Sequence, residues 1–363
     1  MDTSATSCDP SAPEDLGFTS TETWRRLSEG HPFPLSAAYE LTHRCDLHCP
    51  HCYVAPSQRG DELTTAEALG VLDQMAEMGV LVLAVTGGEP TVRRDFMEIL
   101  RGALDRRFVV VLKTNAASLG DDEVRRMADW GLFELNASLY HTDSRQHDRF
   151  VGRAGAWEGT VAALRAFRGA GRNVRVSIMA MGWNLDAVIA LEQMCESEGW
   201  RHAVDFRIEP RNDGSLEPAR HRADANGLVD LVSRSAFLRR RLRPRADGAS
   251  SAGPMMCGAD TGLVIQPDGT VIPCVSLAGF RLGNVRDNKL AEIWRDSAER
   301  RAGLRLRWGD QPRCSGCDLL ADCRRCPATG YIEHGDFTTP SALDCELAAV
   351  WREARLRLQR DGR

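Results

Sequence analysis

The sequence predicts an α/β fold in which a parallel sheet of repeated strand–helix units is followed by a small cysteine-rich domain. Two observations support this prediction. Between residues 37 and about 210, short apolar runs alternate with amphipathic stretches, which is the pattern of βα units. Beyond residue 254, seven of the twelve cysteines lie in a region with few long apolar runs. Such a region needs more than a large core to hold it together, and metal is the obvious candidate.

Six strands are expected, one for each apolar run, at residues 37–42, 81–86, 108–114, 133–139, 174–181 and 203–208. A helix over residues 65–78 should begin with a capping box, because Thr64 and Glu67 can each accept a free amide of the first turn. Four predicted turns from helix to strand contain glycine, which tolerates a positive φ: Gly79, Gly131, Gly171 and Gly199.

Changes in composition divide the chain. After Pro210 the alternation stops, and the Gly/Ser-containing stretch DGASSAGP precedes the cysteine-rich region. We therefore predict an N-terminal extension (1–35), an α/β core (36–215), a helical linker (216–253), a cysteine-rich domain (254–346) and a C-terminal packing helix (347–363).

Composition also narrows the range of functions and partners that we expect for the protein. The chain has 46 basic and 51 acidic residues and no basic block interleaved with aromatics, so nucleic acid is not an expected partner. The polar, acidic N-terminus lacks the features of a signal peptide, and no run of about 18 apolar residues predicts a membrane span. We expect a cytoplasmic protein whose cysteines are ligands or catalysts, with Cys195 a core thiol.

Three cysteines cluster in ELTHRCDLHCPHCYV, directly after the first predicted strand: Cys45, Cys49 and Cys52. On a loop, this spacing lets three thiolates supply three of the four ligands of a [4Fe-4S] cluster, leaving one iron open. A zinc site is the alternative, completed by one of the nearby histidines, His43, His48 or His51.

A second motif, AVTGGEPTVRRDF, follows the second predicted strand. Its two glycines would let a ligand approach the backbone closely, and the carboxylate of Glu89 can attract an ammonium group. Together with the cysteine loop, Gly87-Gly88-Glu89-Pro90 makes the chain resemble the radical S-adenosylmethionine (SAM) superfamily over nearly its whole length.

The resemblance implies a partial, TIM-like (βα)6 barrel in which Cys45, Cys49 and Cys52 bind three irons and the methionine of SAM binds the fourth. Reductive cleavage of SAM would give a 5'-deoxyadenosyl radical that abstracts a hydrogen atom from the substrate. The implied cofactor-binding residues around SAM are Gly87, Gly88, Glu89, Asn115 and Ser138. The aromatic residue usual before the third cysteine is His51 here, which leaves the adenine contact open.

The cysteine-rich region resembles the SPASM domain, which carries two auxiliary [4Fe-4S] clusters in radical SAM enzymes. By that resemblance one set of cysteines holds the outer cluster and the other the inner one: Cys314, Cys317, Cys323 and Cys345, then Cys257, Cys274 and Cys326. Only two residues separate Cys323 from Cys326, where the family has three. Seven thiolates leave one ligand missing, so either an iron is open to substrate or a group such as Asp260 fills the place. Zinc remains the alternative for the Cys-x2-Cys-x5-Cys core.

The SPASM resemblance and the stretch SLYHTDSRQHDRFVGRAGAW favour a peptide substrate that is crosslinked or oxidised. This stretch is similar to a segment common in peptide-modifying members, but it also reads as a loop and a helix start. The resemblance implies an electron donor such as flavodoxin or ferredoxin. About 35 residues before the first strand are too few for a leader-binding domain, so a separate leader-binding protein is expected.

Two other functions stay open at this point. One is a dehydrogenase, epimerase or decarboxylase acting on a small sugar-like or tetrapyrrole metabolite. The other is a non-catalytic iron-sulfur carrier, against which the intact Gly-Gly-Glu-Pro motif argues. No catalytic acid or base is assigned, although Tyr140, His141 and Glu209 stand near predicted strand ends.

Overall fold

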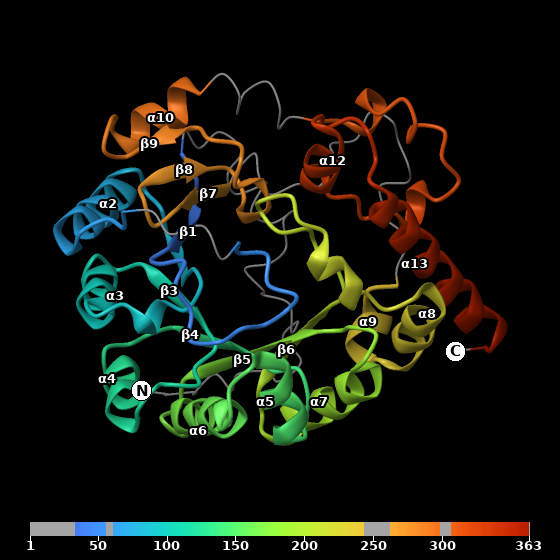
Figure 1. The fold of residues 1–363 in the computed structure, drawn as a ribbon, viewed down its shortest axis with the longest axis horizontal. Helices are drawn as coiled ribbons and strands as arrows, with labels where there is room; N and C mark the ends of the chain where they lie inside the picture. Colours follow the sequence, from blue (N-terminus) through green and yellow to red (C-terminus); the bar gives the residue numbers. More distant parts are fainter. Residues whose placement is uncertain (1–32, 56–60, 243–261, 298–305, 363) are drawn as a thin grey trace, which may run out of the picture.

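The barrel strands follow one another in space as they do in sequence. The computed structural model describes residues 33–55, 61–242, 262–297 and 306–362. Six parallel strands lie side by side in the order of the chain, forming a curved sheet (Figure 1). They are β1 (Ser36–Glu40), β2 (Val82–Thr86), β3 (Val109–Thr114), β4 (Glu134–Ser138), β5 (Asn173–Met179) and β6 (Arg201–Asp205).

Five of the predicted strands agree with these bounds to within two residues, whereas the sixth begins and ends earlier than predicted. Asp205 explains where it ends. Its side-chain Oδ1 accepts the amides of Phe206 at 2.7 Å and Arg207 at 2.9 Å, which turns the chain out of the strand. The apolar Phe206 and Ile208, which extended the prediction, are buried in the loop beyond.

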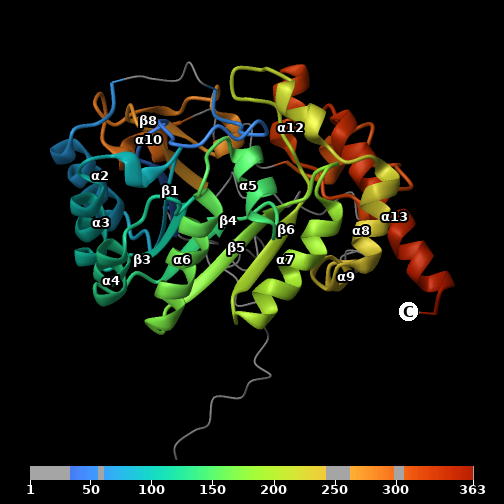
Figure 2. The same ribbon diagram turned by 60° about the horizontal axis from the view of Figure 1, so that its bottom comes forward.

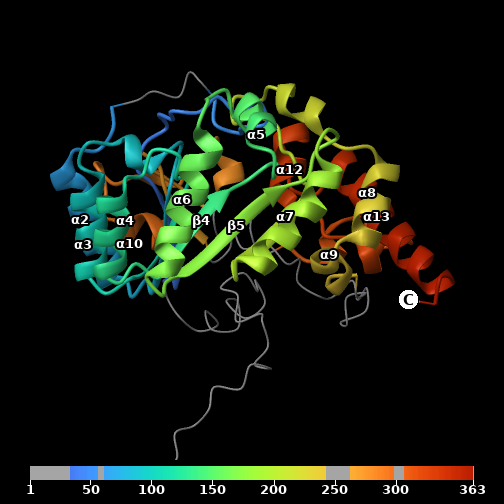
Figure 3. The same ribbon diagram turned by 90° about the horizontal axis from the view of Figure 1, so that it is seen from below.

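Helices cover the outer face of the sheet (Figures 2 and 3). They are α2 (Thr65–Glu77), α3 (Phe96–Asp105), α4 (Asp121–Asp129), α5 (Ser144–Val151), α6 (Ala156–Gly169) and α7 (Leu185–Ser197), with the short η1 (Pro90–Val92) after β2. The predicted capping box at Thr64 is confirmed, since Glu67 N donates to Thr64 Oγ1 at 3.3 Å and Thr64 N donates to Glu67 Oε2 at 2.7 Å. The four turn glycines have φ between 65° and 88°.

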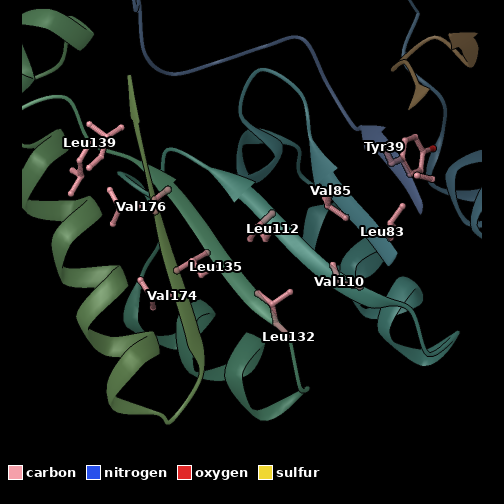
Figure 4. Packing of buried hydrophobic residues seen from close by; sticks show 14 of the residues in the cluster. Tyr39, Leu83, Val85, Val110, Leu112, Leu132, Leu135, Leu139, Val174 and Val176 are labelled. Atoms are coloured by element: carbon pink, nitrogen blue, oxygen red, sulfur yellow. The ribbon is translucent and has the colours of Figure 1, made fainter. Parts of the chain in front are cut away.

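The two faces of the sheet differ in chemistry. Outward side chains such as Leu83, Leu112, Leu135 and Val176 are fully buried against the helices, as Figure 4 shows. Cys195 on α7 belongs to the same core, as predicted. Residues that alternate with them on the inner face of β3 to β5 include five polar ones beside Val109, Val111 and Met179: Lys113, Asn136, Ser138, Arg175 and Ser177. The concave face is therefore chemically suited to a polar ligand rather than to a packed core.

The cysteine-rich region is joined to the barrel more closely than the sequence suggested. Strand β7 (Gly262–Ile265) pairs in parallel with β1, and β8 (Thr270–Ile272) and β9 (Gly283–Asn284) continue the same nine-stranded sheet. The hairpin expected at QPDGTV is confirmed, with Gly269 at φ 85°. Leu263, Ile265 and Val271 enter the main core, because a hairpin of this length cannot bury an apolar face alone.

The remaining elements lie on both sides of the barrel, with α10 beside α2 and with α8, α9 and α13 on the opposite side (Figure 1). They are η2 (Glu217–His221), α8 (Ala225–Arg234), α9 (Ala236–Arg240), η4 (Val275–Leu277), α10 (Leu290–Asp296), η5 (Trp308–Asp310), η6 (Leu320–Asp322), α12 (Pro327–His334) and α13 (Ala342–Arg360). Helix α13 packs on α8 and starts five residues before the predicted helix, because Ser341 Oγ accepts the amide of Asp344 at 3.0 Å. Cys345 thus lies in its first turn. In the part of the chain described, no helix is long and apolar enough to span a membrane.

Candidate active site

The three clustered cysteines lie on the loop that follows β1, at the carboxyl end of the barrel strands. Cys45 is exposed, and Cys49 and Cys52 are partly buried. Burial, together with the charges of neighbouring thiolates, raises the pKa of Cys45 to about 11 and that of Cys49 to about 12. The thiols are therefore close enough to repel one another once ionised, a repulsion that bound iron would relieve.

Gly87 and Gly88 fit against the backbone of the cysteine loop. A Cβ on Gly87 would lie 2.3 Å from the Thr42 carbonyl oxygen, and one on Gly88 would lie 2.4 Å from the Arg44 oxygen. Gly88 N donates to Thr42 O at 2.7 Å, and Glu89 N donates to Arg44 O at 2.8 Å. The close approach that the glycines permit in this structure is thus between two segments of the chain, and it fixes the start of the cysteine loop.

The carboxylate of Glu89 is fully buried and joins the loops after β2 and β3. Its Oε1 accepts the hydroxyls of Thr91 and Thr114, both at 2.7 Å, and its Oε2 accepts the amide of Asn115 at 2.5 Å. Burial raises the pKa of Glu89. Because the Glu89 carboxylate accepts hydrogen bonds from both loops, it holds these loops together. This role is additional to any binding of an ammonium group.

Asn115, another predicted cofactor-binding residue, lies beside the cysteine loop. Its Nδ2 donates to Asp46 Oδ1 at 2.7 Å and lies 3.9 Å from Cys45 Sγ. Asp46 also accepts the Ser118 hydroxyl at 2.7 Å and pairs with Arg153. Burial alone would raise the pKa of Asp46, but the hydrogen bonds and the charge of Arg153 lower it. Sequence reasoning missed this anchor, although an aspartate directly after the first cysteine was a visible signal.

Ser138, at the end of β4, contacts the site through an aromatic neighbour. The Tyr140 hydroxyl interacts with Ser138 and with Cys49, and burial raises the pKa of Tyr140. His51 packs against the ring of Phe150 at 5.3 Å and that of Tyr140 at 5.0 Å. His51, which stands where the family usually has an aromatic residue, thus belongs to an aromatic cluster with Tyr140 and Phe150.

The donor set fits an iron-sulfur cluster better than a zinc ion. Among the described residues, no three His, Cys, Asp or Glu side chains are arranged around one metal ion. Zinc needs four ligands that converge on a point, whereas the thiolates of a four-iron cluster bind separate irons and stand apart. Of the nearby histidines, His43 has a ring nitrogen bonded elsewhere, since its Nε2 lies 3.2 Å from Glu40 Oε2.

The described cysteines beyond the barrel fall into two groups. Cys345 lies within electrostatic range of Cys314 and Cys317, and Cys323 within range of Cys314 and Cys345. Cys326 lies instead within range of Cys274. The division of these cysteines between an outer and an inner cluster stays a prediction. Cys257 and Asp260 lie outside the described residues.

The inner group stands next to the barrel mouth. Cys274 lies within electrostatic range of Tyr53, the residue after Cys52, and of Glu209, which follows β6. Tyr53 donates its hydroxyl to Glu40 at 3.0 Å. Burial raises the pKa of Glu209, and its carboxylate bonds Ser276. One side of the site is therefore formed by the cysteine-rich region.

The stretch from Ser138 to Trp157 shapes the wall of the site. Asp148 accepts the amides of Gly155 at 2.6 Å and Trp157 at 2.9 Å, and so caps α6. His147 Nδ1 accepts the amide of Tyr140 at 3.3 Å. His141 stacks on Trp183 at 6.0 Å. The His-Asp pair, His147 and Asp148, thus has structural partners.

Comparison with family models decides between an enzyme and a passive electron carrier. The model of the radical SAM superfamily matches residues 39–194, and that of SPASM, an iron-sulfur cluster-binding domain, matches residues 257–327. The two models cover more than half of the chain. The chain belongs to the radical SAM superfamily. This radical SAM protein is an enzyme whose cofactors are S-adenosylmethionine and [4Fe-4S] clusters, not a passive electron carrier.

Curated relatives of the radical SAM enzyme include two kinds of protein. An AdoMet-dependent heme synthase of Methanosarcina barkeri (strain Fusaro) is 28% identical over 84% of this chain and 94% of its own length. A PqqA peptide cyclase of Granulibacter bethesdensis is 26% identical over 88% of this chain and 90% of its own length.

Solved structures share the fold. SuiB of Streptococcus suis bound to the precursor peptide SuiA has a TM-score of 0.67 at 17% identity, over 89% of this chain and 79% of its own. The enzyme anSMEcpe with bound AdoMet and the Cp18Cys peptide has a TM-score of 0.67 at 15% identity, over 90% of this chain and 98% of its own. Barrel and cysteine-rich region are thus arranged as one fold in all three proteins.

Proposed function

We propose that this radical SAM enzyme modifies a ribosomally synthesised peptide by crosslinking or oxidation. The observation that carries the proposal is that Cys274 lies within electrostatic range of Tyr53, the residue after Cys52, which would bring an auxiliary cluster close to the SAM-binding cluster. A redox centre there suits a reaction in which the substrate loses an electron as well as a hydrogen atom. The peptide cyclase relatives and the fold shared with two peptide-bound enzymes support a peptide as substrate.

In this proposal the residues have distinct tasks. Cys45, Cys49 and Cys52 hold the cluster on which SAM binds, and SAM supplies the group that removes a hydrogen atom from the substrate. Asp46 and the Gly87-Gly88 backbone hold the cysteine loop in place. Around SAM we assign Gly87, Gly88, Glu89, Asn115 and Ser138. The chain's own contribution is thus to position the reactants and exclude water.

We extend the assignment to the auxiliary clusters. Four thiolates would hold the outer cluster and three the inner one, as the sequence predicted: Cys314, Cys317, Cys323 and Cys345, then Cys257, Cys274 and Cys326. Residues 36–215 would act as the SAM-binding core and 254–346 as the auxiliary domain. One hydrogen bond supports Cys314 as a cluster ligand. The buried Arg325 donates from Nη1 to Cys314 Sγ at 3.6 Å, and the sulfur atoms of cluster ligands commonly accept such bonds.

Two protein partners belong to the proposal. Reduction of the first cluster needs an electron donor, and we assign this role to a flavodoxin or ferredoxin. A separate leader-binding protein would deliver the peptide. Binding of each can be measured with the purified enzyme and candidate proteins from the same genome.

Deuterium transfer tests the substrate class. The reconstituted enzyme is incubated with SAM, a reductant and a pool of perdeuterated peptides, and 5'-deoxyadenosine is examined by mass spectrometry. A Cys45→Ala, Cys49→Ala, Cys52→Ala variant is the control, since it should form no 5'-deoxyadenosine. Deuterium from the peptide pool is the expected result. Its absence, with label arriving from deuterated sugars or tetrapyrroles, would refute the proposal.

The small-molecule alternative keeps one specific support. The heme synthase of Methanosarcina barkeri is 28% identical to this chain. A dehydrogenase, epimerase or decarboxylase acting on a tetrapyrrole is therefore the second candidate, and the tetrapyrrole arm of the same experiment tests it.

A further inference from the structure

Lysine is rare in this chain, and one of its lysines lies inside the barrel. Two of the 46 basic residues are lysines, Lys113 and Lys289, and the others are arginines. Lys113 belongs to β3, which pairs with β2 on one side and with β4 on the other. Its neighbour Leu112 packs against the outer helices (Figure 4), so Lys113 points to the inner face of the sheet.

Lys113 is exposed although its strand lies in the middle of the sheet. Both edges of β3 are paired and helices cover its outer face, so the accessible surface of the side chain is on the inner face. Within the described part of the chain its ammonium group makes no hydrogen bond and no ion pair. The wall of the barrel replaces part of the water around it, which lowers the pKa of Lys113. A bound anion would stabilise the charged form.

The carboxylate of Glu134, which acts on Lys113 from a distance, is already engaged. Its Oε1 accepts Arg175 Nε at 3.0 Å, and its Oε2 accepts Arg201 Nη1 at 3.2 Å. The charged residues on the inner face of β3 to β6 are three cations and two carboxylates: Lys113, Arg175, Arg201, Glu134 and Asp205. This wall therefore has a net positive charge and favours an anionic ligand.

Asn136 on β4 supplies a second donor. It is the register partner of Lys113, so the two side chains lie side by side on the inner face, on strands about 5 Å apart. Asn136 Oδ1 accepts the Ser177 hydroxyl at 2.8 Å, and its Nδ2 has no hydrogen-bond partner among the described residues. An ammonium group and an amide nitrogen on the same face can each donate to one oxygen of a carboxylate.

This donor pair lies next to the residues that we assign to SAM. Thr114, the residue after Lys113, donates its hydroxyl to Glu89 at 2.7 Å, and Asn115 Nδ2 lies 3.9 Å from Cys45 Sγ. Asn115 follows Lys113 by two residues, which is about 7 Å along an extended strand. A substrate held by Lys113 would therefore lie close to the SAM that reacts with it.

We propose that Lys113 and Asn136 bind a carboxylate of the substrate. In the peptide that we propose as substrate, this carboxylate belongs to the side chain of an aspartate or glutamate, and in naming a peptide the inference rests on the proposed function. The carboxylate would pair with the ammonium group and hold the substrate at a fixed distance from SAM. Lys113 thus determines specificity, because a peptide with an amide in this place lacks the charge.

The two lysines allow a selective labelling experiment on the wild-type enzyme. The anaerobically reconstituted enzyme, without reductant, is treated with N-hydroxysuccinimidyl acetate, and acetylation of each lysine is measured by mass spectrometry. The exposed Lys289 is the internal control. The additions are SAM alone, and SAM with one of two pools of N-acetylated, C-amidated peptides of uncharged residues. The central residue is glutamate in one pool and glutamine in the other.

The glutamate pool should slow the acetylation of Lys113 relative to Lys289, and the glutamine pool should not. Equal slowing by both pools would overturn the proposal. Protection by SAM alone would also overturn it, because Lys113 would then bind the carboxylate of the cofactor. This measurement needs no variant, so it holds even if a substitution at Lys113 prevents folding.

Variants test the same pair during turnover. Lys113→Met removes the charge, Lys113→Arg keeps it, and Lys289→Met is the matched control. Each is given the peptide that transfers deuterium and a version whose acidic side chains are replaced by amides. This replacement should lower kcat/KM of wild type and Lys289→Met by about 10- to 100-fold. Lys113→Met should not distinguish the two peptides, whereas Lys113→Arg should keep part of the preference. A full preference in Lys113→Met would refute the proposal.

The carboxylate site and the peptide substrate can fail separately. Deuterium transfer from a peptide that wild type processes equally well with amides in place of its acids would keep the peptide and refute the carboxylate site. If neither pool protects Lys113, protoporphyrin IX and its dimethyl ester decide. Protection by the free acid alone would keep the carboxylate site and refute the peptide, whereas no protection by either would refute the site.

Discussion

Substitution of Gly88 by alanine should displace the cysteine loop. The added Cβ would lie 2.4 Å from the carbonyl oxygen of Arg44 and 2.7 Å from that of His43. Both are backbone atoms, so no side chain can rotate out of the way. The residue does not have a positive φ, so the effect is one of space and not of backbone strain.

The magnitude follows from the contacts. Overpacking costs about 1–3 kcal/mol. Displacement also stretches the Gly88–Thr42 and Glu89–Arg44 hydrogen bonds, each worth about 0.5–1.5 kcal/mol. Gly88→Ala should therefore lower the free energy of unfolding by about 2–6 kcal/mol. Gly70→Ala is the matched control. Gly70 lies inside α2, with nothing within 4 Å of its added Cβ, so alanine should stabilise by about 0.5–1 kcal/mol.

The assay is urea unfolding of the reduced apoprotein, followed by iron analysis of the reconstituted proteins. We expect Gly88→Ala to lose stability and to bind less iron at the first cluster, while Gly70→Ala keeps both. If Gly88→Ala unfolds at the same urea concentration as wild type and binds the same amount of iron, the close-packing argument is wrong.

Three further predictions concern the wall of the site. Asp148→Ala removes the cap of α6 and should lower the free energy of unfolding in urea by about 1 kcal/mol. The rate of 5'-deoxyadenosine formation should not change. A large loss of rate would instead give Asp148 and its neighbour His147 a catalytic role. Burial lowers the pKa of His147 to about 4, so its contribution to stability is present above pH 6.5 and is lost as the pH falls toward 4. His147→Asn keeps an acceptor for the Tyr140 amide and should flatten that part of the stability–pH curve; an unchanged slope contradicts the assignment. Arg153→Met removes the ion pair with Asp46, which should cost less than about 1 kcal/mol but speed the release of iron to a chelator; equal release rates would exclude a role in holding the loop.

The sequence determined the features that depend on neighbouring residues. Alternation of apolar runs gave the strands, and the Thr64 capping box and the Gly269 hairpin formed where their residue types predicted. The cysteine loop and the Gly-Gly-Glu-Pro motif were visible because each is short and contiguous. Their chemistry follows from residue type and spacing, which a chain carries before it folds.

The tertiary structure decided the features that depend on distant residues. Strand β7 pairs with β1, more than 200 positions earlier in the chain, which makes the cysteine-rich region part of the barrel sheet. Asp344 meets Arg207 across 137 positions, and Asp46 meets Arg153 across 107. No local pattern encodes these meetings, because they arise only when packing of the core brings separate strands and helices together. The cysteines could therefore be proposed as ligands from the sequence, whereas the residues that hold the cysteine loop in place emerged only from the fold.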